Sequence, residues 1–159
     1  MYGLRKIAKD GTNIYNDFVW PLEVGAEVEA FDWNPKPIYG GGLYCLPNAQ
    51  GDWTTLNGDD WAVIEFDEKD MVLIGVNKYK VRKCKIVFLS EHPKGKGMDR
   101  FFDFEKFDSE SAYFWALFIG NQDQLVDRIT ESEWACYWAN FIGNQEQLIA
   151  RFPEIASRV

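Results

Sequence analysis

The chain of 159 residues contains one histidine, His92, and only three cysteines: Cys45, Cys84 and Cys136. A Ser-His-Asp set would depend on that single histidine, and the sequence has no Walker-type glycine loop. The cysteines form no CxxC or Cys/His pattern, which predicts reduced, partly buried thiols and no metal site. These scarcities exclude most of the residue sets on which catalysis usually depends.

Long apolar runs are also missing. The longest stretches, such as Ala112–Gly120, are far too short to span a bilayer, and the N-terminus MYGLRKIAKDG lacks the apolar core of a secretory signal. The sequence therefore predicts a cytoplasmic protein with no membrane segment.

Positive charge is scarce overall, since the formal net charge is −8, and scarcest near the C-terminus. Residues 1–107 carry 14 basic and 17 acidic side chains, whereas residues 108–159 carry three Arg, no Lys and eight acids. This balance argues against general nucleic-acid binding and favours a protein partner with a basic surface.

Two charged clusters suggest weaker alternatives. One acidic group could hold a hard cation but lacks the spacing of a calcium loop, so a solvated acidic face is the favoured interpretation: Asp59, Asp60, Asp67, Glu68 and Asp70. One basic run could contact phosphates, but strand alternation would divide it between two faces: Lys78, Lys80, Arg82, Lys83, Lys85, Lys94 and Lys96.

Aromatic residues are abundant, with seven Trp, seven Tyr and twelve Phe, which predicts a folded chain with a large apolar core. Residues 1–97 read as β-rich. The pattern predicts an early hairpin or short meander over 2–20, an alternating strand over 22–31, a loop over 32–42, a short strand at 43–46, and strands at 61–66, 71–76 and 78–91. HPKGKGMDR marks a boundary, so 98–107 is predicted to connect to a second part at 108–159.

The second part is an internal repeat. Residues 108–130 and 131–153 are identical at 13 of 23 positions, including the pentapeptide FIGNQ. Each copy spaces Ala, Trp, Ala and Ile at i, i+3, i+4 and i+7, which predicts a helix with an apolar stripe, and Ser109 and Ser132 are its candidate N-caps. Two such helical pairs are expected to stack and share a core.

FIGNQ is predicted to end one helix and start the next. Gly120 and Gly143 fall where the first helix must stop, in a position that favours a left-handed backbone. Asn121 and Asn144 follow as candidate caps of a second helix, with Gln124 and Gln147 at the spacing of a capping box.

The sequence pattern of the repeat resembles helical repeats in uncharacterised bacteriophage and large-virus proteins; it reads S-E-x-A-x-x-W-A-x-x-I-G-N-x-x-x-L-x-x-R-I. It covers about 46 residues here. The N-terminal part resembles, more loosely, an uncharacterised phage and bacterial domain in which a glycine-rich turn runs into a strand, here Gly42 to Leu46, followed by WAVIEF and a closing strand at Lys80–Phe88. The resemblance implies a host-cytoplasmic, phage-associated protein of unknown function.

GGLY at 41–44 also resembles the ADP-ribosyltransferase-like fold, in which a Tyr packs on the nicotinamide of NAD and a late acidic residue supports the ribose. The resemblance implies Tyr44 as the stacking residue, Glu91 as the acid, and Arg5 or a nearby group on the first strand as the pyrophosphate contact. The first strand lacks a His and no Q/E-x-E motif appears, which departs from that pattern. The favoured interpretation of this region is a tight loop at Gly40–Gly42 with Tyr44 in the core. An NAD-binding enzyme, its inactive descendant or a ligand pocket is the alternative prediction.

The sequence thus predicts an α+β protein: a mixed or antiparallel sheet region packed against two helix-turn-helix repeats. The favoured function is non-enzymatic binding of a basic host or viral protein, with no cofactor and no metal. The candidate partner-binding residues are the acids of the repeats: Asp108, Glu110, Asp123, Asp127, Glu131, Glu133 and Glu146. The alternative interpretation of these acids is a solvated helix surface.

Overall fold

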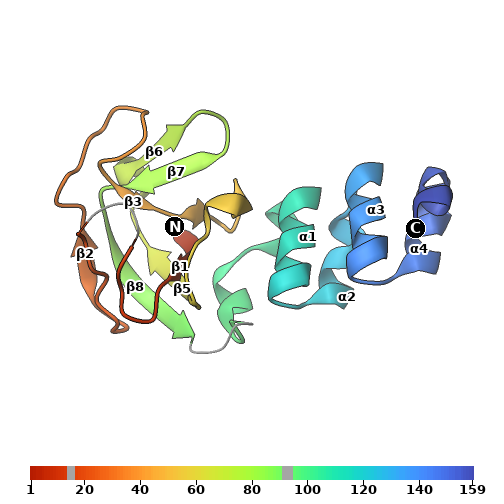
Figure 1. Ribbon diagram of the computed structural model, residues 1–159, viewed down its shortest axis with the longest axis horizontal. Coiled ribbons are helices and arrows are strands. Elements are labelled where there is room, and N and C mark those ends of the chain that lie inside the picture. The colour runs from red at the N-terminus through yellow and green to blue at the C-terminus, as the bar shows by residue number, and fades with distance from the viewer. Residues whose placement is uncertain (14–16, 91–94) are drawn as a thin grey trace. The chain divides into compact units, whose positions relative to one another are not determined.

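The computed structural model describes residues 1–13, 17–90 and 95–159, and divides them into two compact units, Met1–Phe102 and Asp103–Val159. The division falls inside the segment 98–107 that the sequence suggests as a connection. The first unit holds β-strands and the second holds α-helices (Figure 1). The predicted α+β class is therefore confirmed.

The first unit contains two antiparallel sheets. The larger has the order β2-β8-β5-β1-β4 and the smaller the order β3-β7-β6. The strands of the larger sheet are β1 (Tyr2–Ile7), β2 (Glu27–Glu29), β4 (Leu46–Pro47), β5 (Asp60–Glu65) and β8 (Lys83–Ser90). Those of the smaller sheet are β3 (Leu43–Tyr44), β6 (Met71–Ile74) and β7 (Lys78–Val81). Three 3₁₀ turns, Trp53–Thr55, Glu68–Asp70 and Met98–Phe101, connect or follow them.

Strands of both sheets contribute to one core. Its buried residues include Ile7 from β1, Leu43 from β3, Ile64 from β5, Val81 from β7 and Ile86 from β8. The chain passes between the sheets at single residues, because Cys45 separates β3 from β4 and Arg82 separates β7 from β8. The strands predicted at 43–46 and 78–91 are therefore each two strands.

The predicted hairpin over 2–20 is wrong for the described residues. β1 pairs with β5 from Tyr2 to Ile7 and with β4 at Gly3 and Leu4, and the described residues 17–20 form no ladder with either edge of β1. Residues 14–16 of the expected second strand lie outside the described residues, and Phe18–Trp20 form no strand. Local turn residues suggested a hairpin, but pairing with distant strands determines the fold.

Two further strand predictions were too simple. The alternating segment 22–31 forms a strand only at β2, because Gly25 has a φ of +96° and interrupts the extended backbone before it. In β8 the register shifts, so that Ile86 lies opposite Ile64 while Phe88 lies opposite Val63. This bulge places Phe88 on the other face from Ile86, although simple alternation would put both on one face.

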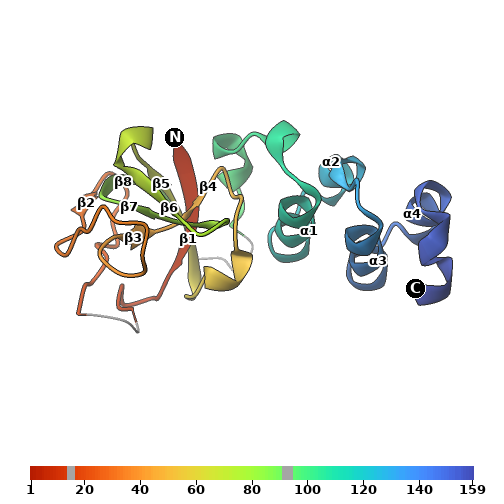
Figure 2. The ribbon, with the colours of Figure 1, turned by 90° about the horizontal axis from the view of Figure 1, so that it is seen from above.

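The second unit is the helical repeat. The two long helices are α1 (Ser109–Phe118) and α3 (Ser132–Phe141), and they lie side by side (Figures 1 and 2). Each is followed by a shorter helix, α2 (Gln122–Leu125) or α4 (Gln145–Arg151). The predicted apolar stripe is confirmed in part: Ala112, Trp115, Ala135 and Trp138 are fully buried, whereas Ala116, Ile119 and Ile142 are half-buried.

The caps of the long helices differ from the prediction. Asp108, not Ser109, is the N-cap of α1, and its carboxylate accepts a hydrogen bond from the Ser111 N–H at 2.8 Å. The Ser109 hydroxyl instead accepts from the N–H of Thr130, at 2.9 Å, where the first repeat ends. Glu131 is the N-cap residue of α3 and makes no side-chain cap.

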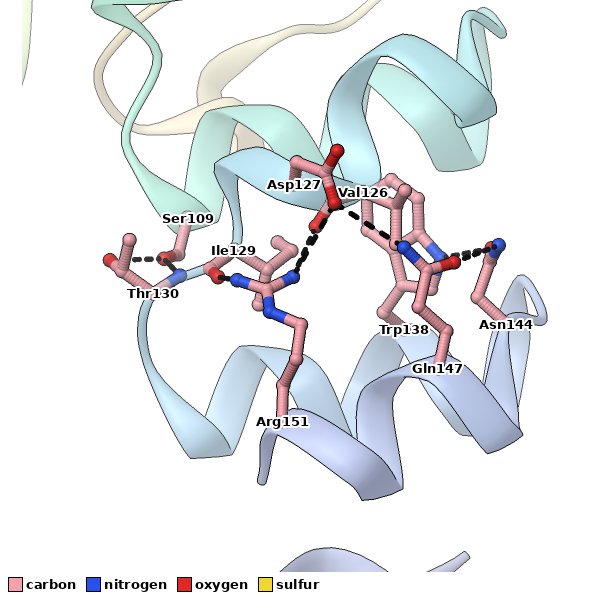
Figure 3. Close-up of polar contacts among 9 residues, drawn as sticks. All are labelled: Ser109, Val126, Asp127, Ile129, Thr130, Trp138, Asn144, Gln147 and Arg151. Carbon is pink, nitrogen blue, oxygen red and sulfur yellow. Dashed lines mark hydrogen bonds and ion pairs between the residues drawn. The ribbon is translucent and has the colours of Figure 1, made fainter. Parts of the chain in front are cut away.

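The asparagine of FIGNQ also does something that its spacing did not predict. Asn121 and Asn144 have φ of +60° and +55°, so they hold the left-handed conformation, and neither side chain caps the following helix. Asn144 Oδ1 accepts the indole N–H of the buried Trp138 at 2.9 Å (Figure 3). In the same way, Asn121 Oδ1 accepts that of Trp115 at 3.1 Å. The predicted capping box is therefore wrong, and the asparagine is an acceptor for a buried tryptophan.

The glutamine three residues on binds the asparagine side chain, not its backbone. The amide of Asn121 donates to Gln124 at 2.6 Å, and that of Asn144 donates to Gln147 at 3.2 Å. Asn144 Oδ1 also accepts from Gln122 of the first repeat at 2.8 Å. The second asparagine thus links the two repeats. Both preceding glycines have the positive φ that was predicted.

An arginine of each repeat reaches back to the backbone that precedes it. Arg151 donates to the carbonyl oxygens of Val126 and Ile129 and lies 4.0 Å from a carboxylate oxygen of Asp127 (Figure 3). Arg128, at the equivalent position, donates to the carbonyls of Glu105 and Phe107. The backbone before α1 therefore accepts hydrogen bonds from the arginine of the first repeat, just as the backbone of the first repeat accepts them from the arginine of the second.

Both ends of the repeat array are closed within the second unit. At the start, Phe104 and Phe107 pack on Trp115 with ring centroids 5.3 and 5.7 Å away. At the end, the 3₁₀ turn Pro153–Arg158 contacts α3 and α4 and buries Ile155 completely. Two repeats are thus enough to form a core.

Candidate functional site

The first unit contains a cavity of about 730 Å³, which is within the usual size range of small-molecule sites. It is formed by segments far apart in the chain: the end of β1, residues around Trp20 and Phe31, the glycine loop Gly40–Gly42 with β3, and residues 54–58. We call it the Arg5 pocket. Tyr44 and Cys45 are among its lining residues, so the surface around Tyr44 is concave.

Arg5 is the most unusual residue of this pocket. In the register of β1 and β5 it lies opposite Ala62, and strand alternation places it on the same face as Ile7, which belongs to the core. Its guanidinium lies 4.0 Å from the ring centroid of the buried Trp20, and its Nη1 donates to the Tyr44 carbonyl at 2.7 Å. Burial lowers the pKa of this guanidinium to about 10, so it remains a cation at neutral pH.

Within the described part of the chain, Arg5 forms no ion pair with a carboxylate. Its hydrogen bonds there go to two backbone carbonyls, those of Tyr44 and Lys6. Fully buried charges in proteins are usually paired, because desolvation of a lone ion is costly, and Arg5 is half-buried. Arg5 is therefore a cation whose counter-ion is not supplied by the described residues.

The glycine loop is held in place by Lys80. This lysine is fully buried, and its ammonium donates to the carbonyls of Ile38 and Gly40, each at 2.9 Å. Desolvation lowers its pKa. A Cβ at Gly42 would lie 2.9 Å from the Lys80 side chain, so only glycine lets the loop pack this closely. The Gly40 N–H donates to the Tyr44 hydroxyl at 2.6 Å, which fixes the tyrosine against the same loop.

The thiols of Cys45 and Cys84 lie close to Arg5 in the core. Burial raises the pKa of both thiols, that of Cys84 to about 12, and the positive charge of Arg5 opposes this only in part. Both are therefore neutral thiols at physiological pH. Cys45 lines the pocket but is not a candidate nucleophile, because nucleophilic cysteines need a lowered pKa.

Of the three residues implied by the ADP-ribosyltransferase-like resemblance, Tyr44 and Arg5 both line the pocket. Glu91 lies outside the described residues, as does His92. The Tyr44 hydroxyl accepts a hydrogen bond from the loop, and the Arg5 guanidinium donates to the backbone of β1 and β3. Both residues thus have structural contacts that account for their positions.

The second unit offers a different kind of site. Opposite the buried stripe, α1 and α3 each carry a glutamate and two aromatic residues at i, i+4 and i+8: Glu110, Phe114 and Phe118 on α1, and Glu133, Tyr137 and Phe141 on α3. These six occupy equivalent positions of the two repeats. Such spacing aligns them along one helix face.

The exposed and half-buried aromatic residues of the two helices, together with one leucine, make up a surface that we call the aromatic face: Phe114, Leu117, Phe118, Trp134, Tyr137 and Phe141. Trp134 joins the rows, with ring centroids 5.7 Å from Phe114 and 5.5 Å from Tyr137. Phe141 is 67% exposed, Phe118 46% and Tyr137 40%. Exposed aromatics grouped in this way are typical of binding surfaces.

The seven predicted acidic residues do not act as one group. Asp108 caps α1, and Asp127 contacts Arg151 and Gln147. Glu110 and Glu133 adjoin the aromatic face, whereas Asp123 and Glu146 lie in the first turns of α2 and α4. Glu131 is the exposed N-cap residue of α3.

Sequence reasoning missed the aromatic face and the role of Trp20 and Lys80. The recurrence of an aromatic residue at equivalent positions 118 and 141, outside the buried stripe, could have indicated the face. No comparable local signal marks Trp20 or Lys80, since their roles depend on distant segments.

Neither a metal cluster nor a membrane span emerges from the described ranges. They contain no group of three or more His, Cys, Asp or Glu side chains placed to hold an ion. Nor do any of their helices combine the length and apolar character needed to cross a bilayer.

Comparisons with known proteins give no match at the level of family, sequence or structure. No protein-family model, no curated protein and no solved structure matches this chain. The resemblance of its repeats to phage and large-virus proteins thus remains a prediction.

Proposed function

We propose that the C-terminal unit is a non-enzymatic protein-binding module, and that its partner presents a basic amphipathic helix to the aromatic face. The observation that carries this proposal is the exposure of large aromatic side chains at equivalent positions of both repeats, Phe118 and Phe141 among them. Side-chain identity at these positions is not needed for the core, which the Trp and Ala stripe already fills.

Charge supports a basic partner. Residues 108–159 carry eight acids and three arginines, and two of those arginines, Arg128 and Arg151, donate to backbone carbonyls of the same unit. Glu110 and Glu133 lie one helical turn before the aromatic rows. A partner helix with apolar residues on one side and Lys or Arg at its edges would match this pattern, with aromatics as anchors and charges guiding encounter.

In the setting that the repeat cadence implies, this partner would be a host or viral protein encountered in the host cytoplasm. An acidic module that covers a basic surface needs neither a cofactor nor a catalytic residue. The interaction should weaken as salt is added, because part of the attraction between the partners is electrostatic.

A photo-crosslinking amino acid tests this proposal. Placed at Phe141 of the full chain, it should capture a basic protein from host lysate, and capture should fall as salt rises. Placed at Val76, which is 87% exposed in the first unit, it should not capture the same protein. Equal capture at both positions, or recovery of nucleic acid alone, would contradict the proposal.

The captured protein then permits a direct measurement. Tyr137→Ser and Phe141→Ser should each weaken its affinity by about tenfold or more, since central aromatic anchors carry most of the energy of such interfaces. Val76→Ser is the matched control and should leave the affinity unchanged. Circular dichroism of each variant checks that the helices remain folded.

A further inference from the structure

The Arg5 pocket has a charge opposite to that of the protein as a whole. The chain has a net charge of −8, yet the charged residues lining the pocket are three bases and one acid: Arg5, Lys6, Lys78 and Asp32. Lys78 lies 3.9 Å from a carboxylate oxygen of Asp52, and the Lys6 ammonium lies over the Trp61 ring, so Arg5 is the main source of positive charge. A cavity whose lining carries an excess of one sign of charge concentrates ligands of the other sign. The lining therefore favours an anion.

Arg5 defines where a negative group would bind. It projects from the core face of β1, and its partners in the described chain are two carbonyl oxygens and the Trp20 ring, with no carboxylate. A guanidinium has five N–H donors, and these two hydrogen bonds use only part of that capacity. A carboxylate or phosphate in the pocket would supply the missing counter-ion and accept charge-assisted hydrogen bonds.

The rest of the lining suits a flat apolar body. Phe18, Trp20, Phe31, Tyr39 and Tyr44 contribute aromatic rings, and Phe18 stacks on Phe31 with centroids 6.1 Å apart. Phe31 and Tyr39 are each 67% exposed, an unusual state for large aromatic side chains. Lys78 donates to the Tyr39 hydroxyl at 2.7 Å and so places a cation beside this ring.

We infer that the Arg5 pocket binds a small aromatic anion, with its carboxylate or phosphate on Arg5 and its ring among the aromatic side chains of the lining. This site is separate from the proposed protein-binding face, because all of its lining residues belong to the first unit. The pocket does not need to catalyse a reaction in order to bind such a ligand.

A matched pair of fluorescent probes tests the charge requirement on the full-length protein. Anilinonaphthalene sulfonate has an aromatic body with a negative group, and N-phenylnaphthylamine has nearly the same body without one. The sulfonate should bind about tenfold or more tightly than the neutral probe, which reflects a charge-assisted contact. Equal affinities, or tighter binding of the neutral probe, would overturn the inference.

Variants identify the site. Arg5→Met and Lys78→Met should weaken sulfonate binding, the first by about tenfold or more, and leave the neutral probe within about twofold. Lys69→Met is the control, since it removes the same charge from an exposed lysine that does not line the pocket. If Arg5→Met fails to fold, Lys78→Met and the comparison of the two probes still decide the result.

One more control separates this site from the aromatic face. Sulfonate binding should be unchanged in Tyr137→Ser and Phe141→Ser, which alter only the second unit. Loss of binding in these variants, or full retention in Lys78→Met and Arg5→Met, would show that the probe binds elsewhere. Competition by an aromatic carboxylate and by a nucleoside monophosphate then shows which anionic group the pocket prefers.

Discussion

Replacing Asn144 by glycine separates two reasons why an asparagine could occupy this position. One is its left-handed backbone, with φ of +55°, which glycine also adopts readily. The other is its side chain, whose Oδ1 accepts the Trp138 indole N–H at 2.9 Å. Asn144→Gly keeps the first property and removes the second. The change in the free energy of unfolding therefore measures what the Asn144 side chain contributes to stability.

The expected cost can be estimated from burial. Trp138 is fully buried, so its indole N–H would lose its acceptor away from water, which costs about 1–3 kcal/mol. Loss of the Gln122 hydrogen bond adds about 0.5–1.5 kcal/mol. Relief of the left-handed backbone offsets roughly 1 kcal/mol. The free energy of unfolding should thus fall by about 0.5–3.5 kcal/mol.

Urea unfolding, followed by circular dichroism at the helix band, measures this change. In a Trp138→Phe background the indole N–H is gone, so Asn144→Gly should then cost close to nothing. Asn121→Gly is the companion variant, because Asn121 accepts from Trp115 in the same way. If Asn144→Gly is as stable as the parent protein, or if its full cost persists in the Trp138→Phe background, the side-chain explanation is wrong.

Three other predictions follow from the first unit. Burial raises the pKa of the Cys45 and Cys84 thiols, so the stability that the neutral thiols provide is present below about pH 9 and is lost above it. The loss is up to about 1.4 kcal/mol per pH unit for each thiol. Urea unfolding midpoints at pH 8 and pH 10 check this prediction, and an unchanged midpoint contradicts it. Gly42→Ala should destabilise by about 1–3 kcal/mol through its clash with Lys80, measured by thermal unfolding, and an unchanged melting temperature would refute this close packing. Incubation with NAD should release no nicotinamide by chromatography; release that Tyr44→Ala abolishes would favour the transferase alternative.

The sequence was most informative where structure depends on neighbouring residues. The repeat, the glycine breaks and the Trp and Ala stripe could all be predicted, because helix periodicity is local. The strand at β5 was found for the same reason. Periodicity could not show whether the side chain of Asn121 or Asn144 caps the following helix or binds a tryptophan indole, because the same sequence position is compatible with both.

The β-rich unit was harder to predict because its pairings are distant. β1 lies between β4 and β5, and the breaks at Cys45 and Arg82 redirect strands that read as continuous. The pocket depends on the same distant pairings. Arg5, Trp20 and Tyr44 are separated along the chain, and no spacing among them signals that they meet.

The backward-reaching arginines have a consequence for how such a protein can grow. Arg128 and Arg151 each donate hydrogen bonds to backbone carbonyls that come just before their own repeat. For the first repeat, these carbonyls belong to the segment before α1. A duplicated block of 23 residues would supply both an arginine that binds the preceding backbone and the backbone carbonyls that the arginine of the next copy binds. Length in this array is thus a variable that evolution, or an engineer, can adjust without redesigning either end.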